Sequence, residues 1–537
     1  MSKKWINCLI CIGLLCSFVI SGWSTPINDE NCSEDSSVDS ISSVYHELLF
    51  PMPTLLNTPA MCQFYNIGYD ICETDDVIRS VGLCMESSIE NTRTFYATSL
   101  IATEYDGQGN TLNEFVRGVD GTTEMISCIC TEDGGYVACG GSYNVDSVEE
   151  QFPILVKFDE DFNLVWKKEF DMFPNALALS VAETSDGFIV TGLMIDYDWI
   201  EDEISDIIVF ETDSDGELLW INSIEIHGFM FPYDIIETSD DGFLIAGNLH
   251  DDYVDVATSH IHLVKLDETG LFEWVKTFNY SEYEGVSDLM RDDEQIIIVG
   301  YAANLSTRKY HSVFCCIDNE GEIVWDDSFR FEDRLFYGMN QTTDGYVITG
   351  HNIDTESSFL LKIDESRMSE WEMITQDGER SIGLAVIQTS KGSFCFTGYT
   401  LDSLSEYPEF FYSAMNTKSV DLNGNEQWNG LFYPMTEISC GFEGNKWMVE
   451  NNGFIGAYNL SYTLEITGNI LGGVHQQTGR LIVVFPGEKE SINTVRLFGF
   501  GKVTLDLLVE GLNIESTTCS VTGFLIGPFF FKMSSSK

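Results

Sequence analysis

The sequence DGGYVACG at residues 133–140 sets a pattern that recurs along the chain. Its full copies are DGFIVTG at 186–192, DGFLIAG at 241–247 and DGYVITG at 344–350, and its weaker copies are IIIVG at 296–300 and FCFTG at 394–398. A seventh copy is recognised from the residues that precede it, because YDICET at 69–74 is similar to YDIIET at 233–238. This copy ends at Gly82. An Asp-Gly pair before a run of β-branched and aromatic residues predicts a tight turn that opens a strand.

The last six copies are followed by a second pattern, in which an Asp precedes a Trp by seven residues. The pairs are Asp159/Trp166, Asp213/Trp220, Asp267/Trp274, Asp318/Trp325, Asp364/Trp371 and Asp421/Trp428. The first copy has Asp106 and Gly109 but carries Asn113 at the Trp position. Because large aromatics at equivalent repeat positions usually fill a core, we interpret these tryptophans as packing wedges between repeats. The alternative is a ring of aromatics that stack on a ligand.

Each repeat is predicted to contain four short strands, which in the third copy span 178–183, 188–193, 207–212 and 218–224. These strands are nearly continuous in Ile, Val, Leu and Phe, so both faces of each sheet must be covered. Four-stranded units of roughly 50 residues that pack face to face are typical of β-propeller blades. We therefore predict an all-β fold in which residues 63–433 form a seven-bladed β-propeller of four-stranded blades, a closed ring without exposed sheet edges.

The repeats resemble those of secreted prokaryotic β-propeller proteins built from T-x-DGG-(Y/F)-(I/V) units, over residues 63–433. The resemblance implies the fold and says little about function. Residues 440–532 contain short strand-like runs between turns, which predicts an Ig-like β-sandwich. The phrases FPGE at 485–488 and LFGFGK at 497–502 resemble an Ig-like module found at the ends of prokaryotic surface proteins. We expect residues 524–531 to be its last strand.

The amino terminus has the features of a secretory signal peptide. Lys3 and Lys4 precede an apolar run over residues 8–20, and cleavage is expected after Ser24. That run is too short to span a bilayer, and no later segment is long and apolar enough to be a transmembrane helix. Residues 1–24 are therefore predicted to be a signal peptide, and residues 25–62 an acidic, Ser-rich linker and amino-terminal extension. A secreted or cell-surface location follows.

The charge balance narrows the range of partners. The chain of 537 residues has 86 acidic and 27 basic residues, and its formal net charge is −59. This charge argues against a nucleic-acid-binding surface, because a polyanion would be repelled before short-range contacts form. Docking on anionic lipid through Lys/Arg clusters is also disfavoured. An extracellular protein or glycan is the expected kind of partner.

Twelve cysteines remain after signal cleavage. Export permits disulfides, and Cys62–Cys72 or Cys128–Cys139 could be linked. The alternative is that the repeat cysteines are small buried thiols, since Cys72, Cys139 and Cys395 stand where neighbouring repeats carry Ile, Val or Ala. No paired C-x-x-C has the spacing of a zinc site, so we assign no metal site.

Two acidic and aromatic loops are the candidate binding site. The strand order places tight turns on one rim of the ring and the longer connections between second and third strands on the other. The candidate residues are Asp196, Tyr197, Asp198, Trp199, Glu201 and Asp202 in one loop, and His250, Asp251, Asp252, Tyr253 and Asp255 in the next. Such carboxylates and aromatics could hold a sugar, or Ca²⁺ or another divalent cation as a cofactor. The alternative is ordinary solvated loop acidity.

Other candidate motifs are weaker. The calcium-loop pattern that begins at Asp213 fails at its twelfth position, which is Ile224. His260 and His262 could bind a metal with His250, but they lack a carboxylate at fixed spacing. The vicinal cysteines at 315–316 are more typical of core thiols than of a redox bridge.

The sequence contains no nucleophile motif, phosphate loop or dinucleotide fingerprint. We therefore favour a non-catalytic binding or adhesion scaffold. The alternative is an extracellular carbohydrate-active enzyme or a quinone-dependent oxidoreductase with its site on the long-loop face. The G-x-x-x-W element resembles the blade signature of quinoprotein dehydrogenases, although their Asp-to-Gly step is one residue longer.

Overall fold

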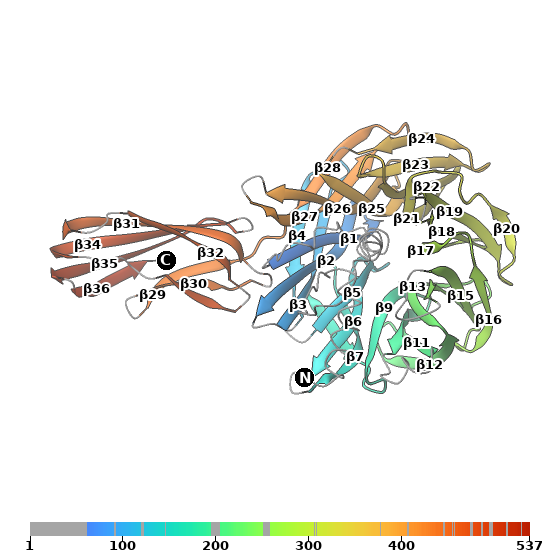
Figure 1. The fold of residues 1–537 in the computed structure, drawn as a ribbon, viewed down its shortest axis with the longest axis horizontal. Coiled ribbons are helices and arrows are strands. Elements are labelled where there is room, and N and C mark those ends of the chain that lie inside the picture. The colour runs from blue at the N-terminus through green and yellow to red at the C-terminus, as the bar shows by residue number, and fades with distance from the viewer. Residues whose placement is uncertain are drawn as a thin grey trace, which may run out of the picture. The chain divides into compact units, whose positions relative to one another are not determined.

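A computed structural model describes residues 62–536 of the chain. Within this range it leaves out residues 91–92, 120–122, 145–146, 195–203, 251–257, 305–306, 308, 376, 405–406, 444–445, 454, 456, 473–475, 485–486, 493–497, 512–513 and 528. The described residues form 36 β-strands and no helix, and hence no helix that could cross a membrane. They divide into two compact units (Figure 1). The first contains residues 62–85, 96–115 and 120–432, and the second contains 86–95, 116–119 and 433–537.

Five four-stranded antiparallel sheets follow one another along the first unit. Their strands are β5 (Thr123–Cys130), β6 (Tyr136–Asn144), β7 (Ser147–Phe158) and β8 (Leu164–Glu169); β9 (Ala176–Glu183), β10 (Gly187–Met194), β11 (Ile204–Asp213) and β12 (Leu218–His227); β13 (Phe229–Glu237), β14 (Phe243–His250), β15 (His260–Leu266) and β16 (Phe272–Phe278); β17 (Tyr283–Asp292), β18 (Gln295–Asn304), β19 (Lys309–Asp318) and β20 (Ile323–Asp326); and β21 (Arg334–Thr342), β22 (Gly345–Asn352), β23 (Ser357–Asp364) and β24 (Ser369–Ile374). In each sheet the strands lie in chain order.

An eight-stranded sheet joins the beginning and the end of this unit. It contains β1 (Cys62–Thr74), β2 (Val77–Glu90), β3 (Arg93–Tyr105) and β4 (Thr111–Arg117), together with β25 (Arg380–Gln388), β26 (Phe394–Leu404), β27 (Tyr407–Val420) and β28 (Glu426–Phe432). Strand β1 pairs in parallel with β27, with Phe64 opposite Tyr412. Asn66 Nδ2 donates a hydrogen bond to the carbonyl oxygen of Ser413 at 2.6 Å, which fastens the two ends together.

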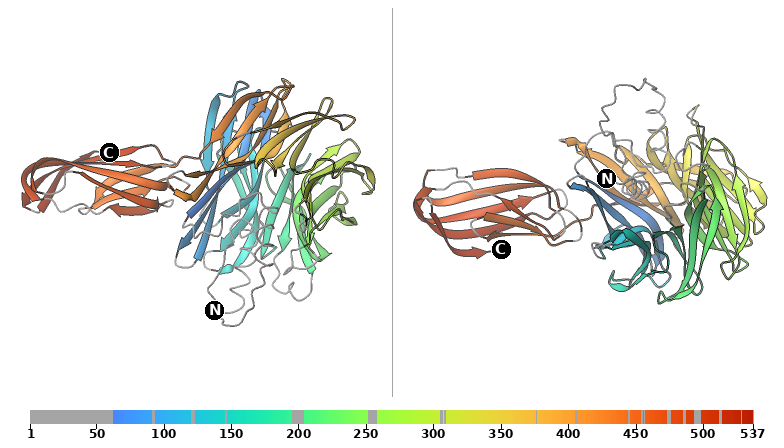
Figure 2. Two further views of the ribbon diagram at one scale, coloured as in Figure 1. Left: turned by 45° about the horizontal axis from the view of Figure 1, so that its top comes forward. Right: turned by 60° about the horizontal axis from the view of Figure 1, so that its bottom comes forward.

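The sheets of the first unit are arranged around a common axis, with the first strand of each sheet innermost and the fourth outermost (Figure 1, Figure 2). This is a β-propeller-like, all-β fold. The four strands expected in the third repeat are confirmed as β9–β12, each extended by at most three residues at an end.

The glycine that closes each repeat is required by a close approach of two strands. Gly192 on β10 lies opposite Ala178, at the point where β9 bulges. A Cβ atom on Gly192 would overlap the carbonyl of Leu177, and one on Gly300 would overlap that of Gly285 in the same way. The regular recurrence of this glycine therefore reflects the bulge in the innermost strand.

The aspartate of the Thr-x-Asp turn between the first two strands is paired with a lysine of the third strand. Lys265 is fully buried, and its Nζ lies 3.1 Å from Oδ1 of Asp240. Thr238 Oγ1 donates to the same oxygen at 2.5 Å. The hydrogen bonds and the lysine charge hold the pKa of Asp240 below its usual value, so the turn keeps an ionised carboxylate. Lys157 with Asp133 and Lys362 with Asp344 repeat this pairing at 2.9 Å and 2.8 Å.

The second unit contains two sheets over one core. The three-stranded sheet has the order β29 (Ile438–Glu443), β30 (Lys446–Asn451), β33 (Lys489–Ile492), and the five-stranded sheet has the order β32 (Gln476–Val484), β31 (Ala457–Gly472), β34 (Phe498–Glu510), β35 (Thr517–Gly527), β36 (Phe529–Ser536). A disulfide between Cys440 and Cys519 links β29 to β35. Trp447, which is fully buried, lies in the core that contains both cysteines.

Two expectations about the second unit and the cysteines need correction. Residues 524–531 are not one strand: β35 ends at Gly527 and β36 begins at Phe529, and the two strands pair as an antiparallel hairpin with Ile526 opposite Phe529. Cys72, Cys128 and Cys139 are free thiols, so neither of the two disulfides considered from the sequence forms. Cys128 and Cys139 are buried, in keeping with the alternative of small core thiols.

Candidate functional site

The two acidic loops lie almost wholly outside the described residues. Of the eleven candidate residues, ten belong to the stretches 195–203 and 251–257, and only His250 is described. His250 is buried at the end of β14, and its Nδ1 lies 3.0 Å from the carbonyl oxygen of Thr258. The geometry of the loop site therefore stays a prediction.

The weaker metal candidates have other partners. His262 Nδ1 lies 2.8 Å from Oγ1 of Thr277, and burial lowers the pKa of this histidine to about 4. His260 Nδ1 lies 3.5 Å from Oε2 of the buried Glu284. In the described part of the chain, no three His, Cys, Asp or Glu residues are grouped as metal ligands.

The turn that begins at Asp213 is closed by its own carboxylate. Asp213 Oδ1 accepts hydrogen bonds from the amides of Asp215 at 3.0 Å and Glu217 at 2.8 Å. Asp267 repeats this arrangement with the amides of Thr269 and Leu271. The Asp of the Asp/Trp pattern therefore shapes a hairpin turn.

Each tryptophan of this pattern lies against the turn between the third and fourth strands of a neighbouring sheet. A Cβ atom on Gly216 would lie 3.0 Å from Cζ3 of Trp166, and one on Gly321 would lie 2.7 Å from Cη2 of Trp274. The same contact joins Trp220 to Gly270, Trp371 to Gly424 and Trp428 to Gly109. Glycine is thus needed at these turns both for its positive φ and for the space that the indole takes.

One of these tryptophans meets an arginine in place of glycine. Arg367 occupies the glycine position of the turn after β23, with a φ of 63°. Its guanidinium carbon lies 4.6 Å from the ring centre of Trp325, within the range of a cation–π contact. Arg367 Nε also donates to Oδ2 of Asp327 at 2.5 Å, which holds the guanidinium over the ring.

The junction without a tryptophan is filled from the other side. Asn113 stands on β4 where the other repeats have Trp. The neighbouring turn carries Phe162 at its glycine position, with a φ of 63°, and this side chain is fully buried. The Phe162 ring stacks on Phe115 with centroids 5.0 Å apart and meets Tyr136 edge-on at 5.0 Å.

Three aspartates connect the innermost strands of neighbouring sheets. Asp70 Oδ2 accepts from the amide of Cys130 at 2.9 Å, Asp234 Oδ2 from that of Leu289 at 2.9 Å, and Asp288 Oδ2 from that of Met339 at 2.8 Å. Burial raises the pKa of Asp70 to about 6 and that of Asp234 to about 7. Burial and the charge of Asp234 raise the pKa of Asp288 well above its usual value.

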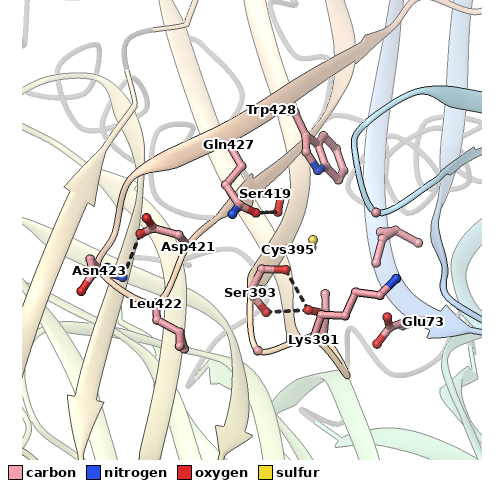
Figure 3. Close-up of a pocket in the computed structure, with 14 residues that line it drawn as sticks. Glu73, Lys391, Ser393, Cys395, Ser419, Asp421, Leu422, Asn423, Gln427 and Trp428 are labelled. Atoms are coloured by element: carbon pink, nitrogen blue, oxygen red, sulfur yellow. Dashed lines mark hydrogen bonds between the residues drawn. The ribbon is translucent and has the colours of Figure 1, made fainter.

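A pocket lies between the two halves of the eight-stranded sheet, on the rim of the tight turns (Figure 3). Its volume is about 390 Å³. Glu73 comes from β1, Lys391 from the turn after β25, and Cys395 and Trp428 from β26 and β28. Ser390 Oγ donates to Oε1 of Glu73 at 2.9 Å, which ties the two halves together beside the pocket.

The chemistry of this pocket suits binding better than catalysis. Burial raises the pKa of the Cys395 thiol to about 12, so the thiol stays protonated and is a poor nucleophile. Lys391 is exposed and its Nζ lies 2.9 Å from Oδ1 of Asp76. Hydrogen bonds from Asn425 and the turn amides hold the pKa of Asp421 below its usual value. The walls thus offer an ammonium group, a carboxylate and the Trp428 ring to a small polar molecule.

Sequence comparison identifies no relative: neither a family model nor a curated protein sequence matches this chain. Among solved structures, an acylaminoacyl peptidase bound to Z-Gly-Gly-Phe-chloromethyl ketone is similar at a TM-score of 0.40 and 11% identity, over 72% of this chain and 58% of that one. The acylaminoacyl peptidase of Pyrococcus horikoshii has a TM-score of 0.33 and 10% identity, over 64% and 58%. A Synechocystis apocarotenoid oxygenase has 0.35 and 13%, over 57% and 71%. Likeness at this level decides neither fold nor function.

The pocket and the buried aspartates were not found from the sequence. The pocket depends on contacts such as Ser390 to Glu73, which are 317 positions apart. The sequence did contain an indication of the aspartates, since Asp70 and Asp234 occupy the same position in the similar segments YDICET and YDIIET. An acidic residue repeated within an apolar strand could have indicated a buried carboxylate.

Proposed function

We propose that this protein is a secreted or surface-displayed, non-catalytic binding or adhesion scaffold, in which a seven-bladed β-propeller is followed by an Ig-like domain. The blade number is supported by strand pairing. Five sheets are separate, and the eight-stranded sheet consists of two four-stranded halves, β1–β4 and β25–β28. These seven groups match the seven copies of the repeat in number, and the pairing of β1 with β27 supports a closed ring.

The Ig-like assignment is supported by the core of the second unit. The disulfide joins one sheet to the other, and the buried Trp447 belongs to the same core. A tryptophan packed beside an inter-sheet disulfide is a recurrent feature of immunoglobulin domains. A disulfide also suits the oxidising exterior to which the predicted signal peptide, residues 1–24, would direct the chain.

The observation that carries the binding role is the contrast between the two rims of the ring. The tight turns on one rim repeat the same contacts from sheet to sheet, with a carboxylate that closes each turn. On the opposite rim, second strands end and third strands begin, and the number of residues between them in the sequence ranges from two, between Leu404 and Tyr407, to nine, between Met194 and Ile204. A rigid framework that holds variable loops is the usual arrangement of a binding protein.

The test compares acidic residues on the two rims. The purified protein is screened against a glycan array and extracellular matrix proteins, and Ca²⁺ binding is measured by calorimetry. We expect Asp198→Ala/Glu201→Ala to weaken binding at least about tenfold, as loss of charge-assisted hydrogen bonds does. The matched control, Asp215→Ala/Glu268→Ala, removes two exposed acids from the tight-turn rim and should bind normally.

Turnover of a glycan or reduction of a quinone, abolished by the loop substitutions, would contradict the scaffold and favour an extracellular enzyme. Binding that the loop variant retains in full would show that the loops are not the site. Unchanged thermal unfolding of both variants confirms that either result concerns the loops and not the fold.

A further inference from the structure

The five-stranded sheet of the second unit carries a group of exposed apolar side chains on its outer face. Successive side chains of β34 and β35 face opposite sides of the sheet. Val503, Leu505 and Val521 therefore enter the core, and the residues between them face outward. On the outer face, Phe500 is paired with Ile526. Further along, Phe524 is paired with Phe531 of β36. Cross-strand partners share a face of the sheet, so these side chains are neighbours.

We call this group the aromatic end, and it consists of Phe498, Phe500, Phe524, Ile526 and Phe531. Each of these residues is between 43% and 56% exposed. The rings of Phe498 and Phe500 lie edge to face, 5.9 Å apart. An exposed apolar cluster of this kind on an otherwise polar surface usually marks an interaction site.

These residues gather at one end of the sheet and not along its middle. Phe498 is the first residue of β34, Ile526 stands one residue before the end of β35, and Phe531 is the third residue of β36. Leu471, next to the end of β31, is 73% exposed. The strands β31, β34, β35 and β36 run side by side, so their apolar ends form a tip (Figure 1, Figure 2).

The same end is free of acidic residues, in contrast to the rest of the chain. The stretches 466–487, 491–505 and 516–537 contain no Asp or Glu, although the chain has 86. Lys502 is exposed and lies directly across from Phe524. At physiological ionic strength the Debye length is about 8 Å, so carboxylates farther away are largely screened from a surface that approaches this end.

The chemistry of the aromatic end fits a lipid surface better than a protein. Phenylalanine and isoleucine offer no hydrogen-bonding groups, whereas protein interfaces favour Tyr, Trp and Arg. Carboxylates, which are costly to desolvate, are missing, and a lysine beside the rings can keep its ammonium group in the headgroup layer. We propose that the aromatic end is a membrane-docking tip that inserts its phenylalanines into the headgroup–acyl boundary of a lipid bilayer.

This inference goes beyond the binding role proposed above, because it concerns the second unit and is independent of the loop rim. The acidity of the whole chain argues against docking through basic clusters. Docking at the aromatic end is instead driven by burial of apolar surface, with Lys502 as a local addition. Vesicles of phosphatidylcholine alone should therefore suffice.

The test is co-sedimentation of the purified protein with phosphatidylcholine vesicles at physiological salt. Phe500→Ser/Phe524→Ser removes two exposed rings and should lower the partition coefficient at least about tenfold, because the apolar area that the rings would bury in the bilayer is lost. The matched control, Leu219→Ser/Leu271→Ser, removes two exposed apolar residues of the first unit and should pellet like the parent protein. A Phe524→Trp variant should show a blue shift of its fluorescence when vesicles are added.

Three outcomes would overturn the proposal. The parent protein fails to pellet with vesicles, the double variant pellets as well as the parent, or the Phe524→Trp emission does not shift. Self-association that the double variant loses, without vesicle binding by the parent, would assign the aromatic end to a second copy of the chain. Normal thermal unfolding of the double variant excludes misfolding as the cause of lost binding.

Discussion

Trp220 and Phe162 fill the same kind of space from opposite sides of a junction between sheets. At the first junction, the indole comes from the fourth strand of one sheet, and Gly270 in the next sheet leaves room for it. At the second junction, the small Asn113 side chain leaves a space, and Phe162 of the next turn fills it.

The partners of the two fourth-strand residues show that they are equivalent. Trp220 Nε1 donates to Oε2 of Glu211 at 2.6 Å. Asn113 Nδ2 donates to Oε2 of Glu104, also at 2.6 Å. Both glutamates stand two residues before the Asp of the turn. The comparison teaches that the ring conserves the filled volume at a junction and not the residue or strand that supplies it.

The largest expected effect is at a junction that depends on tryptophan. Trp220→Ala should lower the free energy of unfolding by about 3–5 kcal/mol, because it leaves a cavity beside Gly270 and Phe243. Chemical denaturation monitored by circular dichroism measures it. Normal stability with lost ligand binding would instead make Trp220 a stacking residue.

A smaller effect is expected when the junction is overfilled from the glycine side. Gly270→Ala adds a Cβ atom against the Trp220 ring at a φ of 76°. Gly134→Ala is the matched control, since its φ is 83° but its nearest neighbouring atoms lie 3.9 Å away. Both substitutions strain the backbone, and only the first crowds the junction. We expect Gly270→Ala to cost about 1–3 kcal/mol more than the control in the same denaturation assay. Equal costs would mean that the turn alone requires glycine.

The smallest effect is expected in the pH dependence of stability. This dependence arises from the aspartates between the innermost strands and not from the tryptophan junctions. Asp70 and Asp234 have raised pKa values, so the folded state binds more protons than the unfolded state between about pH 4 and 7. Their contribution to stability is complete at the low end of this range and is lost as the pH rises through 6 and 7. The thermal midpoint should therefore fall by a few degrees from pH 5 to pH 8.

Asp234→Asn should flatten this pH dependence, because residue 234 no longer titrates. Trp220→Ala should shift the whole profile downward without a change of slope. Differential scanning calorimetry at a series of pH values measures both. A profile that Asp234→Asn leaves unchanged would rule out the buried carboxylate as a source of the pH dependence.

The repeats could be predicted from local sequence because turn and strand signals lie within a few residues of each other. The turn at Asp186-Gly187 and the register of Trp220 are examples, and β9–β12 follow from them. Contacts between distant parts of the chain could not be predicted. Cys440 and Cys519 are 79 residues apart, and no local pattern marks their pairing.

The predicted binding loops show a different limit of sequence analysis. Asp198 and Asp252 were selected for composition, and composition does not determine how a long loop is arranged. The exchange between Asn113 and Phe162 could not be predicted either, since it requires knowing which turn lies beside which strand. Repeat patterns therefore predict strands and turns, while an exchange of side chains across a junction becomes visible only in three dimensions.

A double-mutant cycle at the exceptional junction tests the central claim most directly. Phe162→Gly alone should cost about 3–5 kcal/mol through the cavity it leaves, and Asn113→Trp alone should destabilise by about 1–3 kcal/mol through crowding. If a junction needs one filled volume from either side, the double variant restores the Trp-on-Gly arrangement. Its cost should then be smaller than the sum of the two by about 1–3 kcal/mol, measured by chemical denaturation. Costs that simply add would contradict the account.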